Sequence, residues 1–267
     1  RMGVYWNPDL WTRYNWGPPD SILILPQIMK KAGYVTGHIG KWNITPEALP
    51  YVDECYDLMN WKGAYYPNDT GTYLGVDSPD FYDEPNGWGP PEPGAEYLTD
   101  RLTRHAMEFI DKHQSSPFFL YLAYNAPHYP LQAPKEAVRK YDGRYDIGWD
   151  KLRVQRHRRQ LASGLLPAKW KMSPRPDHIP AWDSLSEKDR QWEADRMEVY
   201  AAMVDLVDEN IGRLVTFLKD KGIFDNTLIL FCSDNGGCPF ERTRGRELAP
   251  WDPKSYWTYD ASWAHAC

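Results

Sequence analysis

Three apolar segments of this chain are each followed at once by polar side chains, and this pattern constrains the fold more than any other feature. The segments cover residues 34–39, 118–124 and 227–232. Continuous apolar runs of this length are typical of strands that are covered on both faces, as in a parallel sheet. Helical patterns precede them, over residues 25–31, 97–113 and 197–221. Because helices that alternate with buried strands form crossover connections, we predict an α/β fold with a mainly parallel sheet flanked by helices.

The predicted helices carry ordinary start and stop signals. Pro26 lies in the first turn of the first helix, where a missing N–H costs nothing, and Gly33 follows its end. Gly222 follows the last helix in the same way. The stretches 50–96 and 129–195 are rich in Pro, Trp and Tyr, and we expect them to be long irregular loops. No internal repeat or domain boundary is visible.

Charge and composition exclude several classes of protein. The net charge of −6 argues against a general nucleic-acid binder, which needs a basic face. No apolar run approaches the ~20 residues that span a bilayer. One basic run, from Lys151 to Arg159, can be interpreted as a phosphate-binding patch. Because the acidic stretch from Glu187 to Glu198 follows closely, we favour a solvated helix surface for it.

The four cysteines and the many aromatic side chains give weaker signals. The cysteines show neither the paired spacing of a zinc site nor the density of a disulfide scaffold. Aromatic residues make up 15% of the chain, and such a surplus either lines a groove for sugars or packs bulky loops. The side chains considered for stacking on a sugar ring are Trp61, Tyr65, Tyr66, Trp88 and Trp149.

Polar residues capable of chemistry follow each predicted strand. Lys41 comes after the first strand, His128 after the second, and the pair Asp234 and Asn235 after the third. In an open parallel sheet, ligands bind beyond the carboxyl ends of the strands. We therefore expect a cation, an imidazole and a pair of hard oxygen donors to face one crevice.

Each of these residues also has a plainer interpretation. Asp-Asn-Gly is common turn chemistry, although the carboxylate and amide oxygens of Asp234 and Asn235 suit Ca²⁺ or Mg²⁺. His128 lies in a Pro-rich loop, where a histidine is either structural or a positioned proton donor. Lys41 either binds an anion or extends along the surface.

Several motifs in order along the chain resemble the sulfatase family, in particular a large branch of bacterial arylsulfatases. Residues 40–42, Gly-Lys-Trp, resemble the family's Gly-Lys-Trp-His segment. Residues 117–134 are similar to its strand and loop that contain Ala-Pro-His, and residues 233–237, Ser-Asp-Asn-Gly-Gly, to its metal loop. Residues 200–204 and 225–227 resemble its late helix and strand, and residues 140–150 and 180–183 resemble the bacterial arylsulfatase branch. The resemblance runs from about Ser21 to the end of the chain.

The resemblance implies an alkaline-phosphatase-like fold that hydrolyses sulfate esters with a formylglycine nucleophile and a bound Ca²⁺. Carried over residue by residue, Asp234 and Asn235 are expected to be two of the calcium ligands. Lys41 is expected to contact the sulfate oxygens. His128 is expected to bind sulfate and to assist departure of the alcohol. Two cations and a proton donor around the sulfate group stabilise the negative charge that its oxygens carry in the transition state.

Three departures from the family pattern qualify this expectation. No cysteine stands in the Cys-x-Pro-x-Arg motif from which formylglycine is made; Cys238 comes nearest, but Pro239 is one place early. Asn43 stands where the family has a histidine that helps the aldehyde hydrate to expel sulfate. The later lysine and small C-terminal sheet domain of the family have no counterpart here. We therefore expect residues 1–267 to be part of a catalytic domain truncated at both ends, with its nucleophile upstream of residue 1 and without activity alone.

The expected activity is that of a sulfuric ester hydrolase acting on a small-molecule or carbohydrate sulfate ester, with catalytic residues His128, Lys41 and Asn43. A phosphoryl or phosphonyl ester hydrolase on the same scaffold is one alternative. A non-catalytic binding relative, suggested by Asn43, is another. Nucleic acid and a membrane span are not expected. By resemblance, the protein is expected to be exported or lysosomal.

Overall fold

The computed structural model describes residues 23–42, 51–59, 96–252 and 255–266. Contacts divide the chain into two compact units, of which the first holds residues up to His128 together with Val207–Leu228, and the second holds Tyr129–Leu206 and residues from Ile229 onward. The elements in chain order are α2 (Leu25–Lys31), β1 (Val35–Lys41), β2 (Glu54–Met59), α3 (Leu98–His113), β3 (Phe118–Ala123), α4 (Lys135–Arg139), α5 (Gly148–Ala162), η2 (Trp182–Ser184), α6 (Glu187–Asp220), η3 (Phe224–Asn226) and α7 (Ala261–Ala264).

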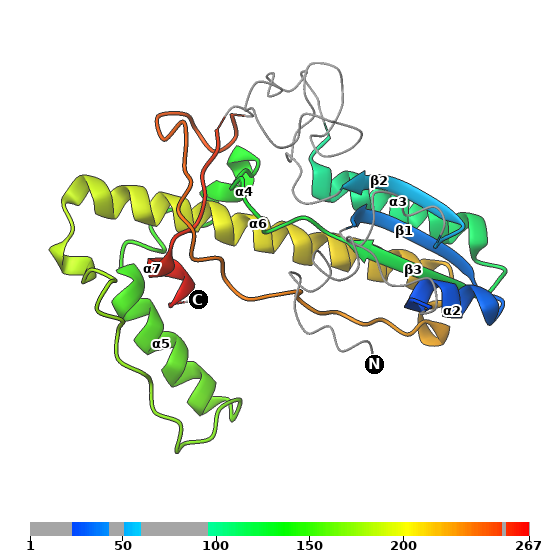
Figure 1. The fold of residues 1–267 in the computed structure, drawn as a ribbon, viewed down its shortest axis with the longest axis horizontal. Coiled ribbons are helices and arrows are strands. Elements are labelled where there is room, and N and C mark those ends of the chain that lie inside the picture. The colour runs from blue at the N-terminus through cyan, green and yellow to red at the C-terminus, as the bar shows by residue number, and fades with distance from the viewer. Residues whose placement is uncertain (1–22, 43–50, 60–95, 253–254, 267) are drawn as a thin grey trace. The chain divides into compact units, whose positions relative to one another are not determined.

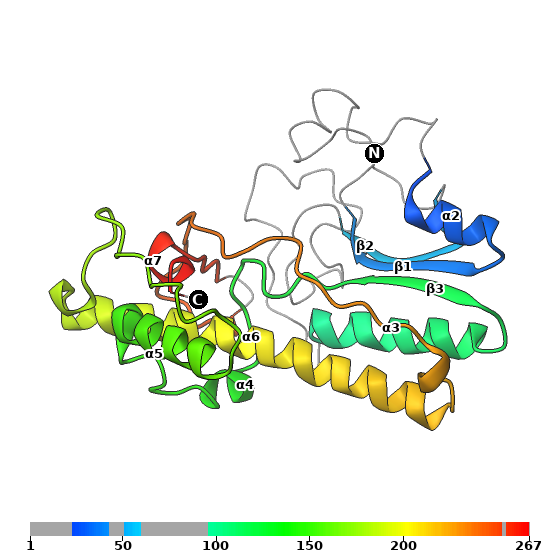
Figure 2. The ribbon, with the colours of Figure 1, turned by 90° about the horizontal axis from the view of Figure 1, so that it is seen from below.

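The first unit contains a three-stranded sheet with the order β2-β1-β3, and both strand pairs are parallel. The β1–β3 register runs without interruption from Val35 opposite Phe118 to Gly40 opposite Ala123. Figures 1 and 2 show the three strands side by side with their carboxyl ends at one edge. The prediction of a mainly parallel sheet flanked by helices is confirmed within the described residues.

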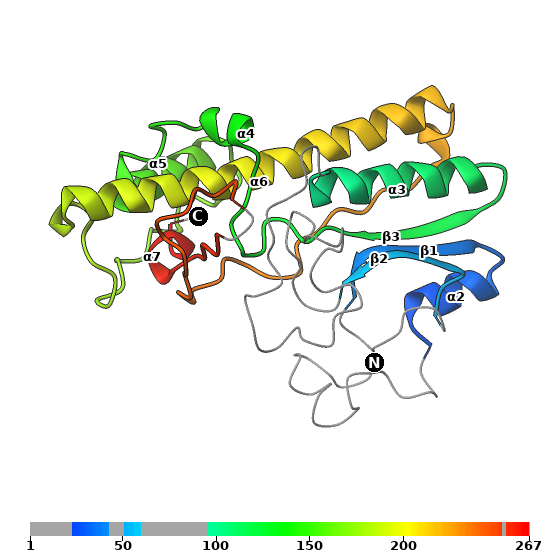
Figure 3. The same cartoon turned by 90° about the horizontal axis from the view of Figure 1, so that it is seen from above.

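Helices α2 and α3 cover opposite faces of this sheet, as Figures 2 and 3 show. The contact face of α3 is apolar and buried, and it includes Leu102, Ala106 and Phe109. The ring of Phe109 lies so close to Gly37 that a Cβ at that glycine would be 2.6 Å from it. A glycine on β1 is therefore what allows α3 to approach the sheet. The end of α6 lies against α3, where Asn210 donates a hydrogen bond to Asp100 over 2.9 Å.

The core of the second unit is built on three tryptophans. Trp149, Trp182 and Trp263 are each at most 4% exposed, and their rings meet edge to face. Trp149 also donates its indole N–H to the carbonyl of Pro180 over 3.1 Å. Trp149 is therefore a core residue and not a surface for a sugar ring. The other four aromatic side chains considered for stacking lie outside the described residues.

The prediction of a third buried strand over residues 227–232 is wrong for this structure. The segment has no regular secondary structure, and Leu228, Leu230 and Phe231 are 85%, 82% and 76% exposed. An apolar run indicates a buried strand only where a neighbouring strand satisfies its backbone groups. None of the described residues pairs with this segment, so its side chains stay at the surface.

The two stretches expected to be irregular contain regular elements. Strand β2 lies within residues 50–96, while α4, α5 and the first nine residues of α6 lie within 129–195. The sequence of β2, Glu-Cys-Tyr-Asp-Leu-Met, contains two carboxylates among its six residues and lacks a continuous apolar run. α5 buries only Gly148 and Trp149 and is otherwise a basic helix with little apolar periodicity. Both elements depend on contacts distant in sequence, which periodicity does not reveal.

Candidate functional site

Lys41 and the loop that carries His128 leave the sheet at the same edge. Lys41 is the last residue of β1, and His128 follows β3 by five residues. Because β1 and β3 are parallel, with Gly40 opposite Ala123, both chains pass this point in the same direction. The structure therefore places Lys41 and the loop of His128 at the carboxyl edge of one sheet, while their roles stay predictions. This edge of β1 and β3 is the candidate site.

A bend at Gly40 sets the direction in which the chain continues to Lys41. Gly40 has φ +95°, a region that side chains rarely adopt. A Cβ there would lie 2.2 Å from the carbonyl oxygen of Ala123 on β3. No other residue type fits both the angle and the contact. The glycine before the lysine is therefore required for the close pairing of β1 with β3 at the site.

His38 lies beneath this bend and is a residue to which sequence reasoning gave no role. Its side chain is fully buried, with its ring 4.8 Å from that of Trp42 and 5.1 Å from that of Tyr121. Nε2 lies 3.1 Å from the carbonyl oxygen of Gly40, which fixes Nε2 as the protonated nitrogen. Burial lowers the pKa of His38 to about 4, although the hydrogen bond to Gly40 acts in the opposite direction. At neutral pH this imidazole is uncharged, so it supports the bend without adding charge to the site.

We expect this buried histidine to make the protein less stable as the pH falls from about 6.5 to about 4. Within that window the unfolded chain binds a proton at His38 that the folded chain does not, because the folded pKa is about 4 and the ordinary value is 6.5. The free energy of unfolding should therefore fall with decreasing pH by up to about 3 kcal/mol from this group. Urea unfolding at half-unit pH steps measures the slope.

The matched variants for this test are His38→Gln and His157→Gln. His38→Gln removes the titrating group and should flatten the slope between pH 6.5 and 4, whatever it costs in stability at pH 7. His157 is partly exposed and lies on α5 in the second unit, and its replacement should leave the slope unchanged. Equal slopes for His38→Gln and the unsubstituted protein would contradict the assignment.

The loop between β3 and His128 is closed by local hydrogen bonds. The backbone N–H of His128 donates to the carbonyl of Asn125 over 2.8 Å, and Asn125 itself is buried. The hydroxyls of Tyr124 and Thr103 lie 2.6 Å apart, which ties the start of the loop to α3. His128 remains partly accessible. Its backbone is thus fixed while its imidazole stays within reach of solvent.

The predicted metal ligands lie in the second unit, on an exposed loop. The hydroxyl of Ser233 donates to the carbonyl of Asn235 over 2.7 Å, and the amide nitrogen of Asn235 donates to the carbonyl of Gly236 over 2.9 Å. The loop thus has the turn chemistry that was the plainer interpretation. The hard oxygens of Asp234 and Asn235 suit Ca²⁺, which takes about six to eight oxygen ligands, so two residues fit as part of such a shell. In the described part of the chain, three or more His, Cys, Asp or Glu residues nowhere gather as a metal site.

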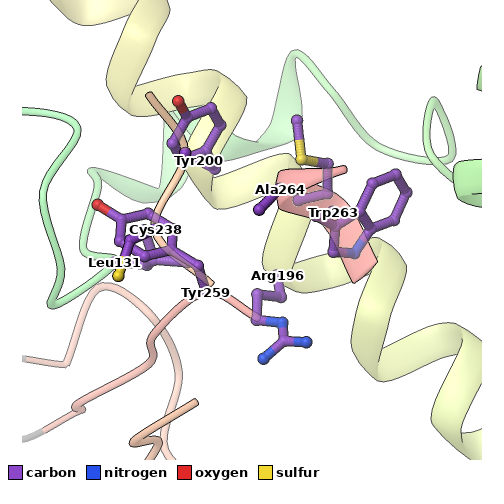
Figure 4. Close-up of a pocket in the computed structure, with 9 residues that line it drawn as sticks. Leu131, Arg196, Tyr200, Cys238, Tyr259, Trp263 and Ala264 are labelled. Carbon is purple, nitrogen blue, oxygen red and sulfur yellow. The ribbon is translucent and has the colours of Figure 1, made fainter. Parts of the chain in front are cut away.

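A small apolar cavity lies behind the end of this loop. Its volume is about 30 Å³, which is room for roughly two water molecules and too little for a sulfated sugar. Gly237 packs here against Ala264 of α7, where a Cβ on the glycine would lie 3.3 Å from that residue. Figure 4 shows the lining side chains of α6 and α7 around it. The cavity is lined by Leu131, Arg196, Met197, Tyr200, Gly237, Cys238, Tyr259, Trp263 and Ala264.

Arg196, one of these lining residues, is the buried centre of an ion cluster whose carboxylates are partly exposed. Its side chain is 2% exposed and contacts the carboxylates of Glu193, Glu241 and Asp260, the last over 3.0 Å. Burial raises the pKa of Glu193 to about 7, against the opposing charge of Arg196. Asp260 also accepts hydrogen bonds from the first N–H groups of α7 over 2.9 and 3.2 Å. The cluster therefore joins α6 to the segment that precedes α7 and to the start of α7.

Two other predictions about the site stay predictions. Asn43 lies outside the described residues. Asp234 and Asn235 belong to a different unit from Lys41 and His128, so their convergence on one crevice is untested.

Comparison with known proteins identifies the class of this chain. The Sulfatase family model matches residues 2–256, and the chain belongs to the sulfatase family. Its fold is the alkaline-phosphatase-like α/β fold of that family.

The chain is similar to several particular sulfatases. An uncharacterized sulfatase of Schizosaccharomyces pombe is 36% identical over 237 residues, which is 81% of this chain and 41% of that protein. The arylsulfatase of Klebsiella aerogenes is 30% identical over 226 residues, 82% of this chain and 48% of that protein. The chain thus spans less than half the length of these two relatives.

Solved structures give the same result. The crystal structure of Ps i-CgsB is 30% identical, with a TM-score of 0.52, and the match covers 83% of this chain and 42% of that one. A second crystal structure shows Ps i-CgsB in complex with k-i-k-neocarrahexaose, at 28% identity, with the same TM-score and coverage. Among the described helices of the present chain, none combines the length and apolar character that crossing a membrane requires.

Proposed function

We propose that the protein carrying this chain hydrolyses sulfate esters of carbohydrates. The observation that carries the proposal is the family match over residues 2–256, with the family's Gly-Lys-Trp and Ala-Pro-His motifs at one sheet edge. The sugar substrate is supported by the complex of Ps i-CgsB with neocarrahexaose. Export from the cytoplasm, or a lysosomal location, belongs to the same proposal.

The residues of this chain have separate tasks in the proposed reaction. The ammonium group of Lys41 binds sulfate oxygens and offsets the charge that they carry in the transition state. The imidazolium form of His128 gives a proton to the bridging oxygen as the S–O bond breaks, and the alcohol leaves neutral. Asn43, as a neutral hydrogen-bond partner, orients the nucleophile's hydroxyl for the release of sulfate. Asp234 and Asn235 would hold Ca²⁺, which supplies positive charge for the sulfate oxygens.

The test is turnover by the whole protein that carries this chain. We expect it to release sulfate from an aryl sulfate and from a sulfated carrageenan oligosaccharide, and to act far less on the matching aryl phosphate. The measurement is a comparison of kcat/KM for the aryl sulfate and the aryl phosphate at the same pH. A preference for the phosphate would replace the proposal with the phosphoryl ester hydrolase. Binding of sulfated sugar without any release of sulfate would indicate a non-catalytic relative.

A further inference from the structure

A strongly basic surface covers one side of the second unit, although the chain as a whole is acidic. Residues 151–175 contain no aspartate or glutamate. Helix α5 and the segment 163–175 that follows it supply the charge, and this pair of segments is called the basic face here. Its positive side chains are Lys151, Arg153, Arg156, Arg158, Arg159, Lys169, Lys171 and Arg175.

The segment 163–175 runs back along α5 and is held there by hydrogen bonds. Arg153 donates to the carbonyl and hydroxyl of Ser173 over 2.8 and 2.7 Å. One turn further along the helix, Nε2 of His157 lies 3.0 Å from the carbonyl oxygen of Trp170. Figure 1 shows the helix and the returning segment side by side. The basic face is therefore a fixed surface in which two adjacent segments both carry cations.

The acidic stretch that follows in sequence does not neutralise this face. Three of its carboxylates on α6 have other partners: Glu193 contacts Arg196, Asp189 contacts Arg246, and Glu198 accepts from the backbone of Gly143. Arg175 pairs with Asp150 of α5 itself. Within the described part of the chain, five exposed cations of the face form no ion pair, namely Lys151, Arg158, Arg159, Lys169 and Lys171. The solvated surface expected from the sequence is thus a concentration of uncompensated positive charge.

The arrangement of these cations suits an extended anion. Lys151, Arg158 and Arg159 share one exposed face of α5, because residues seven and eight apart return to the same side. Lys151 lies about 10–12 Å along the helix from the adjacent pair Arg158 and Arg159, at ~1.5 Å per residue, so the lysine and the arginine pair contact separate anionic groups. Trp170 stands between Lys169 and Lys171 and is 54% exposed. An exposed indole flanked by cations offers a ring for stacking beside groups that bind anions.

We propose that the basic face, together with Trp170, docks a sulfated polysaccharide outside the group that is cleaved. This inference rests on the proposed function, which supplies the choice of polymer. Sulfate half-esters stay fully ionised, and they repeat along a chain of sugar rings. Cations at several points bind the sulfates, and the indole stacks on a ring between them. Such a surface would hold the polymer on the protein by attraction that weakens with salt.

The experiment compares two charge reversals of equal size. Arg158→Glu with Arg159→Glu changes the basic face, whereas Arg139→Glu with Lys188→Glu changes exposed cations of the same unit that have acidic neighbours. Binding of a carrageenan polymer is measured by calorimetry at 0.05 and 0.3 M salt. We expect the first pair to weaken binding by roughly tenfold or more, and the second to change it little. Equal losses for both pairs would show an effect of net charge alone and would overturn the proposal.

A second variant tests the stacking, and further ligands test the choice of partner. Trp170→Ala should weaken binding of carrageenan and leave binding of poly(vinyl sulfate), which has no sugar rings, unchanged. Chemically desulfated carrageenan should not bind. Tighter binding of single-stranded DNA, or of vesicles with anionic lipid, than of carrageenan would overturn the proposal in favour of those partners.

The same variants separate this proposal from the proposed function. Hydrolysis of a small aryl sulfate should be the same in the Arg158→Glu and Arg159→Glu variant as in the unsubstituted protein. Normal aryl sulfate turnover with no loss of polymer binding refutes only the docking surface. Loss of polymer binding on reversal, in a protein that releases no sulfate, refutes only the hydrolysis.

Discussion

Replacing Arg196 with methionine should destabilise the protein by about 3–5 kcal/mol at pH 8, because it leaves the partly buried carboxylates of Glu193 and Asp260 without their counter-charge. Three carboxylates converge on this guanidinium, which is 2% exposed, and Nη1 also donates to the carbonyl of Thr258 over 3.2 Å. Methionine has a similar length, so the lost interaction is electrostatic and little packing changes. Urea unfolding gives the free energy, with tryptophan fluorescence reporting on the core around Trp263.

The pH dependence of this loss distinguishes charge from packing. Without Arg196, burial and the neighbouring carboxylates raise the pKa of Glu193 with no cation to oppose them, so its folded pKa lies above the unfolded value. Protonation of this carboxylate removes the unpaired charge as the pH falls. The loss of unfolding free energy in Arg196→Met should therefore be smaller at pH 5 than at pH 8. Burial already raises the pKa of Glu193 to about 7 with Arg196 in place. A deficit that does not change between these pH values would mean that packing is the cause.

Arg213→Met provides the control on the same helix. Arg213 pairs with Asp100 over 2.9 Å, but its side chain is 49% exposed. Solvent screens an exposed pair of this kind, so we expect a loss of less than about 1 kcal/mol.

Replacing His128 with glutamine in the whole protein should lower kcat/KM for a sulfated sugar by roughly 10²–10⁴. Glutamine keeps a hydrogen-bond donor but cannot transfer a proton to the leaving oxygen. The loss should therefore depend on the leaving group. An aryl sulfate with an acidic phenol leaves as the anion and should be affected much less than an alkyl or sugar sulfate. Steady-state rates with both kinds of ester measure the difference.

The control for this variant is His157→Gln, since His157 is a partly exposed histidine on α5 in the second unit, with its Nε2 3.0 Å from the carbonyl oxygen of Trp170. Its replacement should leave both rates unchanged. If His128→Gln lowers the rates for aryl and sugar sulfates by the same factor, His128 binds sulfate without acting as the proton donor.

The local sequence was sufficient to predict those elements whose apolar residues repeat with the period of a buried strand or of an amphipathic helix. The apolar runs of β1 and β3 and the amphipathic face of α3 predict buried strands and a covering helix, and the structure has them. Parallel pairing follows from the helix between the strands, and it places Lys41 and His128 at one edge. These inferences succeed because burial on both faces leaves a continuous apolar signal in the sequence.

Other features depend on contacts between residues far apart in the chain. Residues 227–232 have the pattern of a strand, but pairing decides whether a strand forms, and the described residues provide no partner. β2 and α5 form without a strong pattern of their own. Trp149 is of the residue type that stacks on sugar rings, but the structure places it in the core. Composition does not distinguish these two roles, because both use large apolar rings.

The sequence by itself determined the family, the parallel sheet and the residues that bear the proposed chemistry, because motifs and periodicity are local. Only the tertiary structure decided the neutral state of His38, the ion cluster of Arg196 and the charge of the basic face. A pKa or an uncompensated charge depends on which groups surround it within a few ångströms. In this protein those groups come from segments as far apart as Glu193 and Asp260 in the sequence.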